Sequence, residues 1–147
     1  GKMLKRANKE LLDLGVDKFA TMVVGVIDTI KNSLSYSVAG HLPLPVLIPS
    51  GENARFLSGE GPPVGLMSDP EFKEQQISLP DAFMLSIFSD GILEILPASD
   101  LLSKEALFLE KFGKSPLPSD DIIKSLGILD AEPAPDDIAG LFISKDH

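Results

Sequence analysis

The chain opens with a pattern of apolar and polar positions that is typical of an amphipathic helix. Apolar residues stand at positions 3, 4, 7, 11, 12 and 14, which is close to the spacing of one helix face. Gly15 ends this pattern. No capping residue precedes Met3, so we expect a helix that is entered partway along its length, with further sequence upstream.

Segments rich in β-branched residues or with alternating polarity then predict strands. Phe19–Ile27 is rich in Thr, Val and Ile, and Leu34–Val38 alternates apolar with polar positions, as a hairpin partner would. Prolines bracket the apolar run Val46–Ile48, and Phe83–Phe88 has the continuous apolar character of a central strand. The remaining strand predictions are Arg55–Leu57, Phe72–Leu79 and Ile138–Ser144.

Helical patterns return toward the end of the chain. One helix is expected to reach residue 112, with Ser99 or Asp100 as its cap and Gly113 as its end. A shorter helix is expected to start at Ser119 and to end at Gly127. Because strands come in runs and helices are grouped, we predict an α+β fold with mainly antiparallel sheets.

Composition narrows the class of protein. The 147 residues include 22 acidic and 13 basic side chains, which gives a formal net charge of −9. A surface this negative argues against sequence-independent binding to nucleic acid or to anionic membranes. The chain has no cysteine, which excludes disulfides and thiolate zinc sites. No stretch reaches about 18 uninterrupted apolar residues, so we expect a soluble protein. The lack of cysteine fits a cytoplasmic location, and the length is that of one domain or a large part of one.

Carboxylates at the ends of predicted strands are the candidate chemical groups. The motif Ser89-Asp90-Gly91 directly follows the predicted central strand, and its glycine lets the backbone turn sharply. Asp136 and Asp137 immediately precede the final strand. If these groups come together, they form a hard-oxygen site suited to magnesium or manganese. On residue types alone, an ordinary turn carboxylate is the favoured interpretation of each, ahead of metal binding. Asp120 and Asp121 form a rival pair, but their place at a helix start favours dipole compensation.

Other catalytic arrangements find little support in the sequence. The two histidines, His41 and His147, cannot form a histidine-rich zinc site, and we interpret His41 as a structural residue between strands. Gly59–Gly65 has the glycine density of a phosphate loop but lacks the Lys-Ser/Thr that follows such a loop, so we interpret it as a shaped turn. No serine lies in a Gly-x-Ser-x-Gly elbow.

Several short motifs occur in an order and spacing that a known family shares. They are Phe19-Ala20-Thr21-Met22, Gly25-Val26-Ile27-Asp28, Tyr36-Ser37-Val38-Ala39-Gly40-His41-Leu42-Pro43, Gly61-Pro62-Pro63-Val64-Gly65-Leu66, Ser89-Asp90-Gly91-Ile92-Leu93-Glu94 and Asp136-Asp137-Ile138-Ala139-Gly140-Leu141. In this order they resemble the bacterial PPM-type (type 2C-like) serine/threonine phosphatases. Within that family, the chain is most similar to the branch of the sporulation and stress-response phosphatases. Members of this branch dephosphorylate anti-sigma-factor antagonists. Many follow a receiver domain, and the chain is similar to the response regulators of the stationary-phase sigma factor.

Two motifs of that family are absent from the chain. Members begin with strands carrying Gly-Asp-aromatic-aromatic-Asp, followed by Asp-x-x-Gly-His-Gly at the first long helix, and neither occurs here. The match starts at the second long helix, where Leu4–Leu12 with Asn8 resembles the family's Leu-Asn pattern. The resemblance therefore implies an αββα sandwich, an antiparallel β-sandwich flanked by helices, that lacks its first strands and helix. Residues 1–147 are expected to form one partial domain.

The resemblance also implies roles for the candidate carboxylates. In the family, two divalent cations, usually Mn²⁺ or Mg²⁺, activate a bridging water that attacks phosphorus in line. Asp90 and Asp136 then correspond to catalytic metal ligands, and Asp137 to a metal-site residue with a supporting role. Ser89 stands where the family usually has threonine, so the hydroxyl is retained.

The function that the resemblance implies is that of a phosphatase output domain in a two-component response regulator, behind an N-terminal receiver domain. Its substrate would be phosphoserine or phosphothreonine on an anti-sigma-factor antagonist. The alternative is a non-catalytic adaptor of the same fold that holds a sigma or anti-sigma factor. Because the family's other metal ligands belong to the absent motifs, we expect this chain alone to be inactive. Sheet edges left open by the absent strands also predict self-association.

Overall fold

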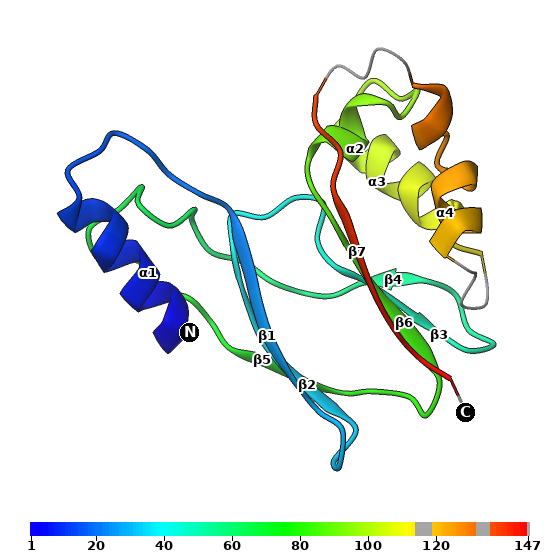
Figure 1. Cartoon of the computed structure of the whole chain (residues 1–147), viewed down its shortest axis with the longest axis horizontal. Helices are drawn as coiled ribbons and strands as arrows, with labels where there is room; N and C mark the ends of the chain where they lie inside the picture. Colours follow the sequence, from blue (N-terminus) through cyan, green and yellow to red (C-terminus); the bar gives the residue numbers. More distant parts are fainter. Residues whose placement is uncertain (114–118, 132–135, 147) are drawn as a thin grey trace. The chain divides into compact units, whose positions relative to one another are not determined.

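The computed structural model describes residues 1–113, 119–131 and 136–146 (Figure 1). The chain divides into two compact units, each with its own sheet. The first unit comprises Gly1–His41 and Ser58–Leu79, and the second comprises Leu42–Leu57 and Pro80–His147. Within the described ranges, no helix has both the length and the apolar composition needed to cross a membrane.

The first unit is a three-stranded antiparallel sheet with one helix, α1 (Lys2–Asp13). Its strands, in spatial order, are β1 (Met22–Asp28), β2 (Ser33–Ala39) and β5 (Gln75–Ser78). All seven residues of β1 pair with β2 in one register, from Met22 opposite Ala39 to Asp28 opposite Ser33. The hairpin that the alternating pattern predicted is thereby confirmed.

Helix α1 is held in place by its buried face. Leu4 is 1% exposed and belongs to an apolar cluster with buried residues of β2 and the following loops. Asn8 is equally buried, and both ends of its side-chain amide are used: Nδ2 donates to the Met67 carbonyl (3.0 Å), and Oδ1 accepts from the Gly65 amide (2.7 Å). A buried amide must be hydrogen-bonded in this way to avoid a desolvation penalty. Asn8 therefore ties α1 to the loop that contains Gly59–Gly65.

The second unit is a four-stranded antiparallel sheet with helices on one face (Figure 1). Its strands, in spatial order, are β4 (Arg55–Phe56), β3 (Val46–Pro49), β6 (Phe83–Phe88) and β7 (Gly140–Lys145). The helical segments are α2 (Gly91–Glu94), α3 (Leu101–Glu110), α4 (Ser119–Ser125) and the 3-10 turn η1 (Ile128–Asp130).

Phe88, at the end of β6, lies at the centre of the core of this unit. Its ring meets those of Phe108 on α3 and Phe142 on β7 edge to face, with centroids 5.5 Å and 5.4 Å away. Such T-shaped pairs add to the stabilisation that burial of the rings provides. Phe88 is 2% exposed, so one side chain joins the central strand, the edge strand and the covering helix.

The sequence predictions agree with most of these elements. The α+β class with antiparallel sheets is confirmed, and β6 has the bounds that were expected. The strand expected at Phe19–Ile27 begins only at Met22, because Ala20 exchanges both backbone hydrogen bonds with Val64 instead (3.0 and 2.9 Å). The short helix α2 was not predicted, and it forms because Ile92 and Leu93 are buried in the core next to β6.

Replacing Phe88 tests this account of the core. We expect Phe88→Ala to lower the free energy of unfolding by about 3–5 kcal/mol, because the cavity removes contacts with three other rings, those of Phe108, Phe112 and Phe142. Phe19→Ala, at a position that is 62% exposed, is the matched control and should change it by less than about 1 kcal/mol. Urea denaturation followed by circular dichroism measures both. Equal losses for the two variants would contradict the assignment of Phe88 to the core.

The cap of α3 gives a pH-dependent prediction. The Ser103 amide donates to Asp100 Oδ1 (2.9 Å) and its hydroxyl to Oδ2 (2.7 Å). The backbone bond first, and the hydroxyl bond second, hold the pKa of Asp100 below its usual value. Because the folded-state pKa is lowered, this stabilisation is present above the unfolded-state pKa and is lost as the pH falls through the folded-state value.

We therefore expect Ser103→Ala to raise the pKa of Asp100 toward its ordinary value, measured by NMR titration of the carboxyl carbon. Ser99→Ala, one residue outside the cap, is the control and should leave that pKa where it is. A titration of Asp100 that is identical in the wild type and in Ser103→Ala would show that the Ser103 hydroxyl does not lower this pKa.

Candidate functional site

The pairing of β6 with β7 determines which residues meet at the candidate site. The two strands run antiparallel from Phe83 opposite Lys145 to Phe88 opposite Gly140. In an antiparallel pair, the residues that follow one strand face those that precede the other. The segment after β6 contains Asp90, and the segment before β7 contains Asp136 and Asp137. The topology therefore brings these two segments to the same end of the sheet.

Ser89 joins the two segments directly. Its amide donates to the Ala139 carbonyl (2.9 Å), which extends the ladder by one step beyond β6. Its hydroxyl accepts from the Ala139 amide (2.8 Å) and donates to the Asp137 carbonyl (3.1 Å). A serine hydroxyl can donate and accept at once, so it can bridge two backbone groups of the opposite segment. Sequence analysis noted only that this hydroxyl is retained in the motif and did not foresee the bridge.

Gly91 allows the two segments to approach closely. A Cβ atom built on Gly91 would lie 2.4 Å from the Asp137 carbonyl oxygen and 3.0 Å from its carbonyl carbon. Any larger residue would have to push the Asp137 backbone away. The glycine after Asp90 was expected to permit a sharp turn, whereas in the structure it makes room for the opposite chain.

The Asp90 carboxylate does not cap the helix that begins beside it. Asp90 occupies the N-cap position of α2, yet its side chain makes no capping hydrogen bond, and its φ and ψ of −63° and −25° are already helical. Its carbonyl accepts from the Leu93 amide (2.8 Å). The side chain is exposed. The carboxylate is therefore available to a ligand at the surface.

Asp136 and Asp137 differ in how they are held. Both are exposed, and Asp136 Oδ1 accepts from the Asp137 amide at 2.8 Å. The Asp137 carbonyl is bound by Ser89. Of the predicted site residues, the structure thus brings the segment of Asp90 against that of Asp136 and Asp137.

The donor set has the chemistry of a divalent-cation site but is small. Carboxylate oxygens are the ligands that Mg²⁺ and Mn²⁺ favour. Among the described residues, however, no group of three or more His, Cys, Asp or Glu side chains is arranged to hold a metal ion. The three carboxylates therefore have suitable donor chemistry, but among the described residues they do not form a metal site by themselves.

The remaining candidates belong to other parts of the chain. Asp120 and Asp121 stand in the first turn of α4, where dipole compensation was expected, and Asp121 Oδ1 lies 3.9 Å from Lys124 Nζ. His41 is half-buried and follows β2 after one intervening residue, Gly40, and His147 lies outside the described residues. The structural role suggested for His41 remains a prediction.

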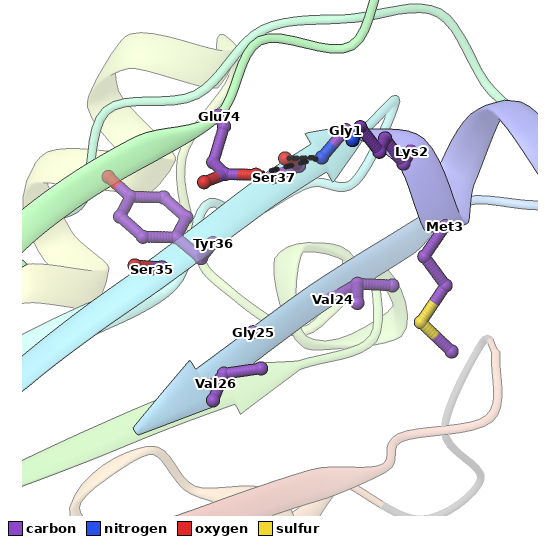
Figure 2. A pocket seen from close by; sticks show the side chains of 10 residues that line it. All are labelled: Gly1, Lys2, Met3, Val24, Gly25, Val26, Ser35, Tyr36, Ser37 and Glu74. Carbon is purple, nitrogen blue, oxygen red and sulfur yellow. Dashed lines mark hydrogen bonds and ion pairs between the residues drawn. The ribbon is translucent and has the colours of Figure 1, made fainter. Parts of the chain in front are cut away.

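A separate hollow lies in the first unit, beside the start of α1 (Figure 2). It has a volume of about 470 Å³, and the Gly1 amino group in its wall donates to Ser37 Oγ at 2.8 Å. Its single carboxylate, from Glu74, lies 3.5 Å from the same amino group. The lining is Gly1, Lys2, Met3, Val24, Gly25, Val26, Ser35, Tyr36, Ser37 and Glu74. The only carboxylate in this lining is already ion-paired, so the lining offers no set of catalytic side chains.

Comparison with known sequences identifies the family. The family model described as Stage II sporulation protein E (SpoIIE) matches residues 1–146. The chain is also 33% identical over 90 residues to Protein IcfG of Synechocystis, a match that covers 60% of this chain and 14% of that protein. The chain thus spans a small part of this curated relative.

Solved structures share the fold over nearly the whole chain. The RsbU and RsbW domains of a Mycobacterium tuberculosis protein match with a TM-score of 0.70 and 23% identity, over 97% of this chain and 46% of that one. The phosphatase domain of Bacillus subtilis SpoIIE, presoaked with manganese, matches with a TM-score of 0.67 and 15% identity, over 100% and 75%. The chain belongs to the SpoIIE family and has the fold of the PP2C-type (PPM) phosphatase domains.

Proposed function

We propose that this chain is part of a metal-dependent protein serine/threonine phosphatase. The observation that carries the proposal is the bridge by Ser89, which joins the segment of Asp90 to that of Asp136 and Asp137. Two carboxylate-bearing strand ends have no structural need to be fastened together at an exposed surface, whereas a shared cation gives them one. Membership of the SpoIIE family supports the same activity, since a solved structure of this fold is a phosphatase domain.

Within this proposal, Asp90 and Asp136 hold the divalent cation, Mn²⁺ or Mg²⁺, and Asp137 supports the site. Bound between carboxylates, such a cation supplies Lewis-acid activation of water for attack on a phosphoryl group. Ser89 and Gly91 are positioning residues, because one fixes the Asp137 backbone and the other leaves space for it. Asp90 keeps its carboxylate out of the helix cap and so presents it to the cation.

We further propose that the chain is a partial domain and that other carboxylates complete the ligand set. Two facts support this: the described residues hold no cluster of three potential ligands, and the chain spans 75% of the SpoIIE phosphatase domain. A cation held by few carboxylates keeps most of its water and binds weakly, because each missing ligand removes charge and chelation. The chain by itself should then have little activity.

The proposed setting is a cytoplasmic response regulator in a phosphorelay. The resemblance carried by the Ser89-Asp90-Gly91 and Asp136-Asp137 motifs supports a receiver domain upstream and an anti-sigma-factor antagonist as the phosphorylated substrate. The net charge of −9 supports a protein partner over nucleic acid or an anionic membrane.

A second candidate function is that of a non-catalytic adaptor that holds a sigma or anti-sigma factor. The observation in its favour is the absence, among described residues, of a three-ligand cluster. The two functions differ in what Asp90 does. An enzyme needs its carboxylate for turnover, whereas an adaptor keeps partner binding when that carboxylate is lost.

The activity prediction has two parts. With saturating Mn²⁺, the 147-residue chain should hydrolyse p-nitrophenyl phosphate at less than about one hundredth of the rate of the SpoIIE phosphatase domain. A longer chain that includes the flanking coding sequence should hydrolyse a phosphoserine peptide, and Asp90→Asn should lower its kcat/KM on the order of 100-fold. Asp120→Asn, on α4, is the matched control and should leave turnover unchanged.

Two results would contradict this proposal. Full turnover by the 147-residue chain, abolished by Asp90→Asn, would show that its metal site is complete. An inactive longer chain that still binds a sigma or anti-sigma factor would favour the adaptor.

The role of Ser89 can be tested by Mn²⁺ binding, followed by electron paramagnetic resonance on the longer chain. Ser89→Ala should weaken binding several-fold, because each lost hydrogen bond to the Asp137 segment is worth about 0.5–1.5 kcal/mol. Ser89→Thr retains the hydroxyl and should bind like the wild type. If Ser89→Ala and Ser89→Thr bind Mn²⁺ equally well, the hydroxyl does not position the site.

A further inference from the structure

Two cross-strand pairs on β6 and β7 each combine a large side chain with a small one. The register sets Phe88 opposite Gly140 and Ser86 opposite Phe142. Residues that are directly opposite in an antiparallel pair, and residues two apart on one strand, point to the same side of a sheet. All four positions therefore share one face, on which large and small residues alternate along both strands.

Gly140 has no space for a side chain. A Cβ atom built there would lie 2.8 Å from Phe88 Cε1 and 3.2 Å from its Cδ1. The φ of Gly140 lies outside the left-handed region, so the approach of the ring, and not the backbone conformation, requires glycine. The ring itself has little room to move, because it is 2% exposed and contacts the rings of Phe108, Phe112 and Phe142.

Ser86 is the small member of the second pair. It is 1% exposed and lies opposite Phe142. Its hydroxyl has no hydrogen-bond partner among the residues that the structure describes. A buried hydroxyl without a partner is unfavourable, so hydrogen bonding does not account for a serine at this position. Its small size, next to a phenylalanine on the facing strand, does.

The sizes of these side chains distinguish the observed register from its neighbours. A shift by one residue turns every side chain of a strand to the other face. A shift by two keeps the faces, but in one direction it sets Phe88 opposite Phe142, and in the other it sets Ser86 opposite Gly140. Two large residues overpack the core, two small ones leave a cavity, and both defects destabilise it.

The same register decides which residues meet just beyond the strand ends. The Ser89 amide donates to the Ala139 carbonyl (2.9 Å), and the Ala139 amide donates to the Ser89 hydroxyl (2.8 Å). These two residues directly follow the Phe88–Gly140 pair. A shift by two residues, about 7 Å along the strand, would set Ser89 opposite residue 137 or 141 and break both bonds.

We propose that the Phe88–Gly140 and Ser86–Phe142 pairs fix the register of β6 against β7 by their complementary sizes and thereby position the acidic segments of the candidate site. The four residues act through the backbone, and none of them contacts a cation. The role in positioning rests on the proposed phosphatase function, whereas the role in fixing the register does not.

Amide hydrogen exchange of the 147-residue chain, followed by NMR, tests the register. Gly140→Ala should raise the exchange rate of the Ala139 amide about tenfold or more relative to the amides of β3, because the added methyl group pushes β7 away from β6. Ser86→Leu should act in the same way, and Ser86→Ala, which stays small, should not. Gly25→Ala, in β1 of the first unit, is the matched control for replacing a strand glycine. An unchanged Ala139 exchange rate in Gly140→Ala overturns the proposal.

A smaller side chain at position 88 gives a second variant. Phe88→Leu removes the ring atoms that an added Cβ would meet, so Gly140→Ala combined with Phe88→Leu should exchange several-fold more slowly at Ala139 than Gly140→Ala alone. Independent sites would instead show additive effects. Additive effects in the double variant would overturn the complementarity of the pair.

Mn²⁺ binding by the longer chain, followed by electron paramagnetic resonance, tests the positioning role. Gly140→Ala should weaken binding about tenfold, Phe88→Leu should restore part of the loss, and Gly25→Ala should bind like the wild type. If Gly140→Ala binds Mn²⁺ as the wild type does while Asp90→Asn binds more weakly, the positioning role fails and the proposed function stands. Binding that Asp90→Asn leaves unchanged would contradict the proposed function, and the exchange experiment would still decide the register.

Discussion

The antiparallel pairing of β6 with β7 is the interaction on which the second unit and its candidate site both depend. It places Phe88 opposite Gly140, and a Cβ built on that glycine would lie 2.8 Å from the Phe88 ring, so the ring packs directly against the backbone of β7. The aromatic core of this unit packs around Phe88, at the end of the paired strands. The acidic segments lie just past the same end of the pairing. A change in register by one residue would therefore disturb packing and site together, because side chains alternate between the faces of a sheet.

Ser89 extends that pairing into a region without regular structure. Its three hydrogen bonds to the 137–139 segment replace the ladder where the strands end. A backbone held in this way can carry exposed acidic side chains at defined positions, which a free turn could not. The two acidic segments are thus joined by neutral groups, and the Asp90 carboxylate makes no capping hydrogen bond.

The two sheets differ in how they treat their edges. In the second unit, the edge strand β7 carries the acidic segment at its start and is packed through Phe142 against Phe88. In the first unit, β1 packs Val24 against the apolar cluster that includes Leu4 and exposes Val26. Strand β1 and the candidate site lie in different compact units.

The order of the elements and the identity of the acidic motifs could be predicted from the sequence, because both are local properties. Periodicity predicted α1, the β1–β2 hairpin and β6, since apolar spacing reflects the geometry of each element. It did not predict α2, because a single turn of helix is too short for a period and forms only when Ile92 and Leu93 find a core. The motif with Asp90 was recognisable, but the partner of Ser89 lies 48 residues away, at Asp137. Only tertiary structure decides such a contact, since it depends on which strands pair and in which register. For the same reason the need for glycine at position 91 became clear only when the chain that passes within 2.4 Å of its Cβ position was known.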